Sequence, residues 1–172
     1  MNIILLGYMG SGKSTVGRIL AGKLKLDFVD FDQFLEEKEN MSIKDIFSRK
    51  GEIYFRKLEH KYLEEVLSIT PRAVISLGGG TPCYGTNMEL IKHKVKNSVY
   101  IKVGIEELTE RLWNAREERP LLKHQDTREK MDEFVRKHLF ERSFYYNQAA
   151  IKILVDGRSA IAVAQEIKLR LL

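Results

Sequence analysis

The feature that most constrains this chain is a glycine-rich loop that begins at its seventh residue. The stretch GYMGSGKST, residues 7–15, matches the pattern G-x-x-x-x-G-K-[ST] in full. A short apolar run at residues 2–6 precedes it, and residues 14–26 follow it with helical spacing of apolar side chains. A strand that turns through such a loop into a helix directs several backbone N–H groups at one point, where they can bind phosphate. We call residues 7–15 the P-loop.

The side chains of the P-loop predict which phosphate-bearing ligand it binds. Lys13 would reach the β- and γ-phosphates of a nucleotide, and the Ser14 hydroxyl would ligate Mg²⁺. A glycine-rich turn without a ligand is the alternative, and the flanking strand and helix argue against it. The residues expected to bind the nucleotide are Gly10, Ser11, Gly12, Lys13, Ser14 and Thr15.

The rest of the chain alternates between strand-like and helix-like patterns. Further strands are expected at residues 27–31, 73–77, 98–103 and 151–155. Helices are expected from residue 33, from 42 to about 68 with a break near Gly51, and at about 105–114, 127–148 and 160–172. This alternation predicts a three-layer α/β/α fold with a five-stranded parallel sheet. No linker or repeat interrupts it, so residues 1–172 are expected to form one domain.

Composition narrows the classes of protein further. Of 172 residues, 44% are hydrophobic and 31% charged, with no run of about 18 apolar residues. We therefore expect a cytoplasmic protein that binds no membrane. The net charge is +5, but acidic residues lie among the basic ones, which favours small anions over nucleic acid as ligands.

Cysteine and histidine suggest no further chemistry. The single cysteine, Cys83, fits a reducing compartment and is expected to pack in the interior. His60, His93, His124 and His138 show no metal-ligand spacing, and we expect them on the surface or in a loop over the site.

A P-loop alone is compatible with a GTPase, a mechanical ATPase or a kinase. The guanine-reading tetrapeptide N-K-x-D, which a GTPase would normally carry, is absent. The third expected strand ends in Gly78, Gly79 and Gly80 instead of the acidic residue that is usual in mechanical ATPases. A kinase of a small molecule remains, and other segments must bind its acceptor.

Acidic and basic residues in those segments are the candidates. Asp30 and Asp32 sit at the end of the second expected strand, and their alternation predicts that both carboxylates point the same way. One could hold the water shell of the metal and the other the acceptor hydroxyl; a helix cap and a surface carboxylate are the alternative. Arg56, Arg119 and Arg142, each taken alone, are better explained as surface charges.

Together, these segments resemble the shikimate kinase family of small P-loop kinases. Six motifs in one order are far more specific than any one of them, and they span nearly the whole chain. They are GxxGxGKST at residues 7–15, D-x-D at 30–32, F-R at 55–56, S-x-GGG at 76–80, R-P-L-L at 119–122 and E-R-x-x-x-Y at 141–146.

The resemblance implies an activity. It implies transfer of the γ-phosphate of ATP to the 3-hydroxyl of shikimate, giving shikimate 3-phosphate and ADP in aromatic amino-acid biosynthesis, with Mg²⁺ as cofactor. It also implies a P-loop kinase fold with a substrate-binding helical region at about residues 32–60 and a mobile lid at about 114–125. We expect a monomer. A kinase of another small acceptor, such as gluconate or a nucleotide, and a non-catalytic ATP-binding module are the alternatives.

On the acceptor side, the resemblance assigns roles to three charged residues and one glycine turn. Asp32 would bind the ring hydroxyls. It would also orient the hydroxyl that attacks the phosphate, or act as its base. Arg56 and Arg142 would hold the substrate carboxylate. The turn Gly78–Gly80 would contribute substrate-binding backbone, with Gly79 offering an N–H group.

On the donor side, the resemblance places Asp30 on Mg²⁺, through water, beside Ser14. Lys13 and Arg119 would supply positive charge around the transferred phosphoryl group, with Arg119 carried by the lid. Arg111 and Arg116 both compete for stacking on adenine, and Arg111 is preferred.

Arg158, after the last expected strand, is a further candidate for a contact with adenine.

Overall fold

The computed structural model describes residues 1–171. Within these residues one sheet has five strands in the order β2-β3-β1-β4-β5, and every neighbouring pair is parallel. The strands are β1 (Ile3–Leu6), β2 (Asp27–Asp30), β3 (Ala73–Ser76), β4 (Asn97–Lys102) and β5 (Ile151–Leu154). The predicted α/β class and the five-stranded parallel sheet are confirmed.

Burial explains the composition of the strands. All residues of β1 and β3 are buried, which is why both read as unbroken or nearly unbroken apolar runs. Strand β5 lies at the edge of the sheet and alternates instead, with Ile153 buried and Leu154 exposed.

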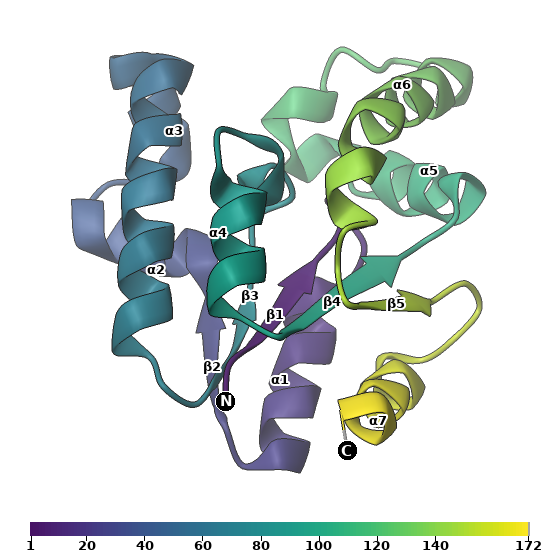
Figure 1. The fold of residues 1–172 in the computed structure, drawn as a ribbon. Coiled ribbons are helices and arrows are strands. Elements are labelled where there is room, and N and C mark those ends of the chain that lie inside the picture. The colour runs from purple at the N-terminus through teal and green to yellow at the C-terminus, as the bar shows by residue number, and fades with distance from the viewer. Residues whose placement is uncertain (172) are drawn as a thin grey trace.

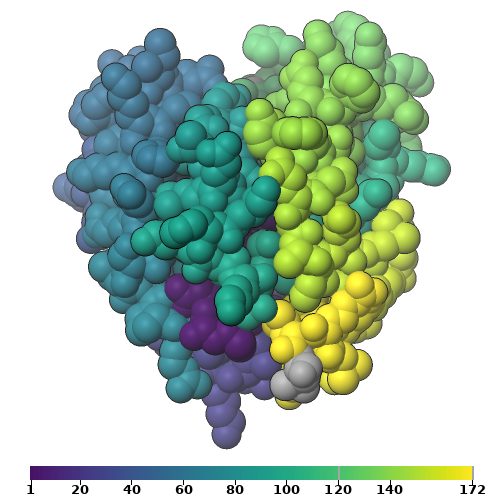
Figure 2. All heavy atoms as spheres, viewed as in Figure 1, coloured from purple at the N-terminus to yellow at the C-terminus, as the bar shows by residue number. Residues whose placement is uncertain are grey.

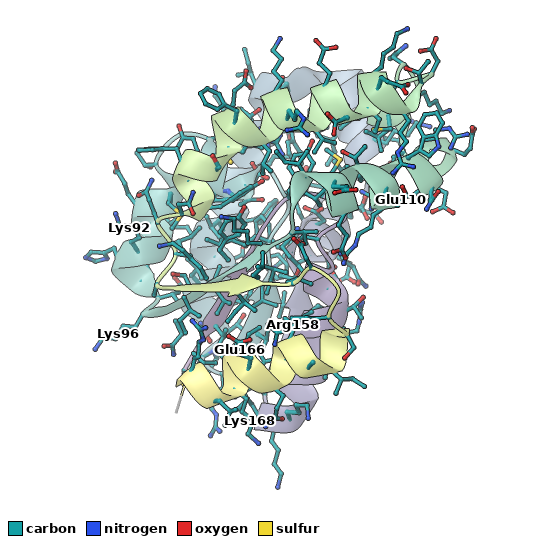
Figure 3. All side chains as sticks on the ribbon, turned by 90° about the vertical axis from the view of Figure 1, so that its right-hand side faces the viewer. Lys92, Lys96, Glu110, Arg158, Glu166 and Lys168 are labelled. Atoms are coloured by element: carbon teal, nitrogen blue, oxygen red, sulfur yellow. The ribbon has the colours of Figure 1, made fainter. Side chains whose placement is uncertain are left out.

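Helices cover both faces of the sheet, as Figures 1 and 3 show. On one face α1 (Lys13–Leu24) packs against α7 (Ala160–Leu171). On the other, α4 (Asn87–Lys94) contacts α3 (Ile43–Ile69). The predicted three-layer arrangement is therefore present. The expected end of the last helix, Leu172, lies outside the described residues.

Two helices follow β2 and stand beside the end of the sheet. Helix α2 (Phe31–Glu39) begins directly after the strand, and α3 begins after Ser42, whose side chain accepts a hydrogen bond from the Asp45 N–H at 3.1 Å. Gly51 has φ 81° and ψ 172° inside α3, so the predicted break is confirmed.

Two further helices stand on the other side of the strand ends. Helix α5 (Ile105–Asn114) leads into the short 3₁₀ turns η2 (Arg116–Glu118) and η3 (Pro120–Leu122), and α6 (Arg128–Tyr146) follows. The carboxyl ends of the strands therefore lie between α5 and α6 on one side and α2 and α3 on the other. Figure 2 shows a notch in the surface there, between the blue α3 side and the green α6 side.

One connection differs from expectation. The 3₁₀ turn η1 (Thr81–Cys83) and α4 lie where no element was predicted. Helix α4 has eight residues and buries only three of them, so its periodicity is too short to stand out in the sequence.

Among the described residues, no helix combines the length and apolar character needed to cross a membrane.

Candidate active site

A cavity of about 390 Å³ lies at the carboxyl ends of the strands. It is the place where a parallel α/β sheet binds ligands. Its walls come from the P-loop, the ends of β2 and β3, and the segment before η3. The predicted residues that line it are Gly10, Gly12, Lys13, Ser14, Thr15, Asp30, Asp32, Gly78, Gly79 and Arg119.

The P-loop holds its lysine against its own backbone. Lys13 Nζ donates hydrogen bonds to the carbonyl oxygens of Gly7 at 2.8 Å and Tyr8 at 3.0 Å, and lies 3.4 Å from Ser11 Oγ. Burial lowers the pKa of Lys13 to about 8, although Asp32 opposes the shift. A desolvated ammonium of this kind is stabilised by an anion, and a phosphate placed in the loop would provide one.

Ser14 and Asp30 form a site whose chemistry fits Mg²⁺. Ser14 Oγ donates to Asp30 Oδ2 at 2.8 Å and lies 3.3 Å from Ser76 Oγ. Mg²⁺ is commonly held by one or two carboxylates together with substrate phosphates, and these oxygens suit that mode. No group of three His, Cys, Asp or Glu side chains that could hold a metal alone occurs within residues 1–171.

Asp30 also caps α2, since its Oδ1 accepts from the Gln33 N–H at 3.4 Å. The two interpretations of Asp30, helix cap and metal-side carboxylate, therefore describe one side chain whose two oxygens have different partners.

Asp32 reaches the cavity by a different route from the one predicted. Strand β2 ends at Asp30, so Asp32 lies in the first turn of α2 and the expectation that both carboxylates alternate along one strand is wrong. Its carboxylate lies against Gly78, where an added Cβ would come within 2.6 Å of Asp32 Oδ1. Only glycine leaves room for this approach. Burial raises the pKa of Asp32 to about 6, and the charges of Asp30 and Glu59 add to the shift.

Arg56 of α3 and Arg142 of α6 converge on the glycine turn. A Cβ built at Gly80 would lie 3.1 Å from Arg56 Nη1 and 3.3 Å from Arg142 Nη2. Two guanidinium groups this close repel each other, and an anion between them removes the repulsion. A carboxylate is an anion that such a pair of guanidinium groups could bind.

A buried glutamate, which sequence reasoning missed, holds Arg56 in this position. Arg56 Nη1 donates to Glu59 Oε1 at 2.8 Å, and Thr81 Oγ1 donates to Glu59 Oε2 at 2.7 Å. Glu59 is only 2% exposed. The i,i+3 spacing of Arg56 and Glu59 on one helix was the available signal. Arg56, Glu59 and Arg142 carry a net charge of +1, and the exposed Glu52 lies 3.6 Å from Arg56 Nε.

Two of the histidines, expected on the surface or in the lid, are half-buried and hydrogen-bonded to other elements. His60 Nδ1 lies 2.7 Å from Asn87 Oδ1, and Asn87 Nδ2 donates to the Thr81 carbonyl at 2.8 Å. His138 Nδ1 lies 2.8 Å from the Tyr8 hydroxyl.

Burial lowers the pKa of His138 to about 4, with a further contribution from Arg142. The ring is therefore neutral near pH 7 and can accept a hydrogen bond from Tyr8, which joins α6 to the P-loop.

The arginines proposed for adenine lie in different environments. Arg111 Nη1 donates to the Gly10 carbonyl at 3.0 Å, which places it on the P-loop, and its other end pairs with Glu107. Arg116 instead stacks on Trp113, with its Cζ 3.9 Å from the ring centroid. Of these two arginines, Arg111 is therefore the one that contacts the P-loop.

Arg158 is not brought to the cavity. It pairs with Glu166 of α7 at 2.6 Å and donates to the Leu154 carbonyl at 2.9 Å, and Figure 3 shows it beside Glu166.

The segment predicted as a lid places one cation in the cavity. Arg119 lies between η2 and η3 and lines the cavity beside the P-loop. Its charge contributes to the low pKa of Lys13. Leu122 is fully buried, whereas Leu121 is 69% exposed, so the segment is anchored at its later end.

The remaining polar groups near the turn have structural partners. Tyr146 donates its hydroxyl hydrogen to the Gly79 carbonyl at 2.5 Å. Burial raises the pKa of Cys83 to about 11, and the side chain packs against the core, as predicted. An un-ionised thiol of this kind is a poor nucleophile.

Comparisons with known proteins agree with this geometry. The family model described as shikimate kinase matches residues 9–172. A shikimate kinase of Flavobacterium johnsoniae is 48% identical over 165 residues, covering 96% of this chain and 95% of its own. Among solved structures, a shikimate kinase from Bacteroides thetaiotaomicron has a TM-score of 0.87 at 34% identity, covering 99% and 96% of the two chains. A shikimate kinase from Acinetobacter baumannii in complex with shikimate has a TM-score of 0.86 at 33% identity, covering 99% and 92%.

Proposed function

This chain belongs to the shikimate kinase family, and from that membership we propose which of its residues carry each part of the reaction. The enzyme transfers the γ-phosphate of ATP to the 3-hydroxyl of shikimate, giving shikimate 3-phosphate and ADP. The observation that supports the assignment to this cavity is the position of Asp32 against Gly78. The P-loop lies on one side of it, and the paired arginines meet two residues further along the same turn.

On the donor side, the P-loop residues 10–15 bind the phosphates of ATP, and Arg111 lies beside the adenine. Ser14 would hold Mg²⁺ directly and Asp30 would hold it through water, and the ion would supply positive charge between the phosphates. Lys13 contacts the β- and γ-phosphates when it exchanges its backbone carbonyl partners for phosphate oxygens. Arg119 adds a second cation at the transferred group.

On the acceptor side, Arg56 and Arg142 bind the carboxylate of shikimate, and the turn Gly78–Gly80 offers backbone N–H groups to the ring. Asp32 accepts a hydrogen bond from the attacking hydroxyl and takes its proton as the phosphoryl group transfers. Phosphoryl transfer proceeds through a loose transition state, so orientation and charge neutralisation matter more than a strong base. A carboxylate with a pKa of about 6 suffices.

The wider description of the enzyme is proposed with the site. Residues 1–172 form one domain, with the substrate-binding helical region at about 32–60 and a lid at about 114–125 that closes over both substrates. We propose that the enzyme acts as a monomer. ATP and shikimate are its small-molecule substrates. We assign it to the cytoplasm, without a nucleic-acid or membrane partner, on its composition.

A coupled ADP-release assay tests the substrate assignment. We expect turnover with shikimate and little with gluconate or nucleoside monophosphates. Gluconate is the sharper control, because it also carries one carboxylate and several hydroxyls, whereas a nucleotide carries a doubly charged phosphate. Absence of turnover with shikimate would refute the function. Removal of Mg²⁺ by a chelator should abolish turnover with shikimate.

A further inference from the structure

We propose that Tyr84 is a positioning residue for the substrate carboxylate, because its ring fixes the plane of the Arg56 guanidinium. The inference rests on the proposed function, since it takes Arg56 as a carboxylate ligand. Tyr84 follows η1 in the connection to α4, and none of the sequence motifs includes it.

The contact between the two side chains is close. Arg56 Cζ lies 3.6 Å from the centroid of the Tyr84 ring. The next aromatic rings, Phe55 and Phe47, have their centroids at 5.1 Å and 6.0 Å. Tyr84 is therefore the ring on which the guanidinium stacks, in the geometry that favours a cation over an aromatic face.

Hydrogen bonds alone do not fix the orientation of the Arg56 guanidinium. Arg56 Nη1 donates to Glu59, but Nε is buried without a hydrogen-bond partner, and the nearest carboxylate oxygen, of Glu52, lies 3.6 Å away. A group held through one nitrogen can swing about that bond, and a stacked ring prevents this motion. The plane is then fixed with Nη2 at the Gly80 turn, 3.2 Å from where a Cβ would lie.

The loop that carries Tyr84 is itself anchored to α3. The Asn87 N–H donates to the Tyr84 carbonyl at 3.2 Å, and the Asn87 side chain joins Thr81 to His60. The position of the ring is therefore set from the same helix that carries Arg56.

Tyr84 is half-buried and lies outside the hydrophobic core of the described residues. It borders a groove of about 770 Å³ between α3 and its own loop, beside Ile53, which is 77% exposed. A ring in this place does not fill the interior, so a role in packing does not account for it.

Kinetics of Tyr84→Leu and Tyr84→Phe test the proposal. We expect Tyr84→Leu to raise the KM for shikimate by about three- to thirtyfold, the range of a cation–aromatic contact, with kcat and the KM for ATP nearly unchanged. Tyr84→Phe retains the ring and should behave like the wild type. Phe140→Leu, at an aromatic residue of α6 that is 84% exposed, is the matched control and should change nothing.

The neutral methyl ester of shikimate separates positioning from general damage. Because the ester carries no charge for Arg56 to bind, Tyr84→Leu should lower kcat/KM for the acid but leave that for the ester nearly unchanged. An equal loss for acid and ester, or a large fall in melting temperature, would show a structural role and overturn the proposal. Equal KM values for the Leu and Phe variants would overturn it too. Failure of the wild type to phosphorylate shikimate would instead refute the proposed function.

Discussion

Burial beside Asp30 and Glu59 raises the pKa of Asp32 to about 6, so its ionised form is destabilised by the fold that uses it. The folded protein holds this proton up to higher pH than the unfolded chain, in which the ordinary pKa is 3.8. Stability from this group is therefore present below about pH 4 and is lost as the pH rises through about 6. Above that pH the carboxylate is ionised, which is the form that can accept a proton, and its buried charge lowers the stability of the fold.

Asp32→Asn should separate these two effects. We expect turnover to fall by about 100-fold or more, with ATP binding retained, because the attacking hydroxyl loses its acceptor. At pH 8 the variant should be more stable than the wild type by about 1–3 kcal/mol, since it removes an unfavourable buried charge. At pH 4 the difference should disappear. Urea unfolding at both pH values measures it, and a variant less stable than the wild type at pH 8 would contradict the assignment.

The pKa of Lys13 predicts how activity changes at alkaline pH. Burial lowers its pKa to about 8 in the free enzyme, so its positive charge is lost as the pH rises above that value. We expect kcat/KM for ATP to fall above about pH 8 in the wild type, and Lys13→Arg should move this fall to higher pH. Lys13→Met should reduce phosphoryl transfer by about 100-fold or more at any pH. An alkaline limb that Lys13→Arg leaves in place would assign the titration to another group.

Replacing Glu59 should change both the affinity for shikimate and the stability of the protein. Glu59→Gln removes the buried charge that pairs with Arg56 and leaves only the exposed Glu52, 3.6 Å from Arg56 Nε, as a counter-ion. We expect a rise in the KM for shikimate of about tenfold and a loss of about 1–3 kcal/mol of unfolding free energy. Glu64→Gln, at an exposed glutamate of the same helix, is the control and should change neither. An unchanged KM in Glu59→Gln would mean that Arg56 needs no counter-ion to stay in place.

At the scale of elements, the break in α3 depends on the backbone of one glycine. Gly51 has φ 81° and ψ 172°, and no atom lies within 4 Å of where its Cβ would be. Gly51→Ala should therefore cost about 1–3 kcal/mol through backbone strain alone. Gly22, inside α1 with equally open surroundings, is the matched control, and Gly22→Ala should stabilise by about 0.5–1 kcal/mol. Urea unfolding measures both, and changes of the same sign would contradict the explanation.

Elements with a continuous pattern or a motif were predictable, and those built from tertiary contacts were not. The strands, the long helices and the Gly51 break follow from apolar runs, helical spacing and a glycine. Helix α4 and η1 do not, because their conformation is fixed by Asn87 and Thr81 binding partners on α3. Sequence reasoning also placed Asp32 at the end of the strand, although Asp30 with Gln33 three residues later was an available sign that α2 begins directly after Asp30.

The same division holds for the site. Motif residues such as Lys13 and Arg142 were named because their spacing along the chain matches a known family. Glu59 and Tyr84 were missed because their importance lies in what they touch, the Arg56 side chain, and no fixed spacing joins Tyr84 to it. Arg158 was named from its place after the last strand; its side chain pairs with Glu166 of α7, and its contact with adenine stays a prediction.

At the scale of the whole molecule, donor and acceptor sites are built on different parts of the fold. The P-loop joins β1 to α1, whereas the proposed carboxylate site depends on α3 and α6. The strand ends bring the two together under the notch in Figure 2. Tyr8 and His138 connect them directly, because one belongs to the P-loop and the other to the helix that carries Arg142.

Ligand-induced stabilisation should therefore be separable by mutation. A ligand at 100 times its Kd stabilises a protein by about 2.7 kcal/mol, which for a chain of this size corresponds to a melting-temperature rise of about 5–10 °C. We expect shikimate to produce this rise in the wild type and in Lys13→Met, but not in Arg142→Ala, whose KM for shikimate should rise strongly. ADP with Mg²⁺ should stabilise Arg142→Ala normally and Lys13→Met only weakly, because Lys13 binds phosphate. Loss of both responses in either variant would mean that the two sites fold as one unit, against the separate origins of their residues.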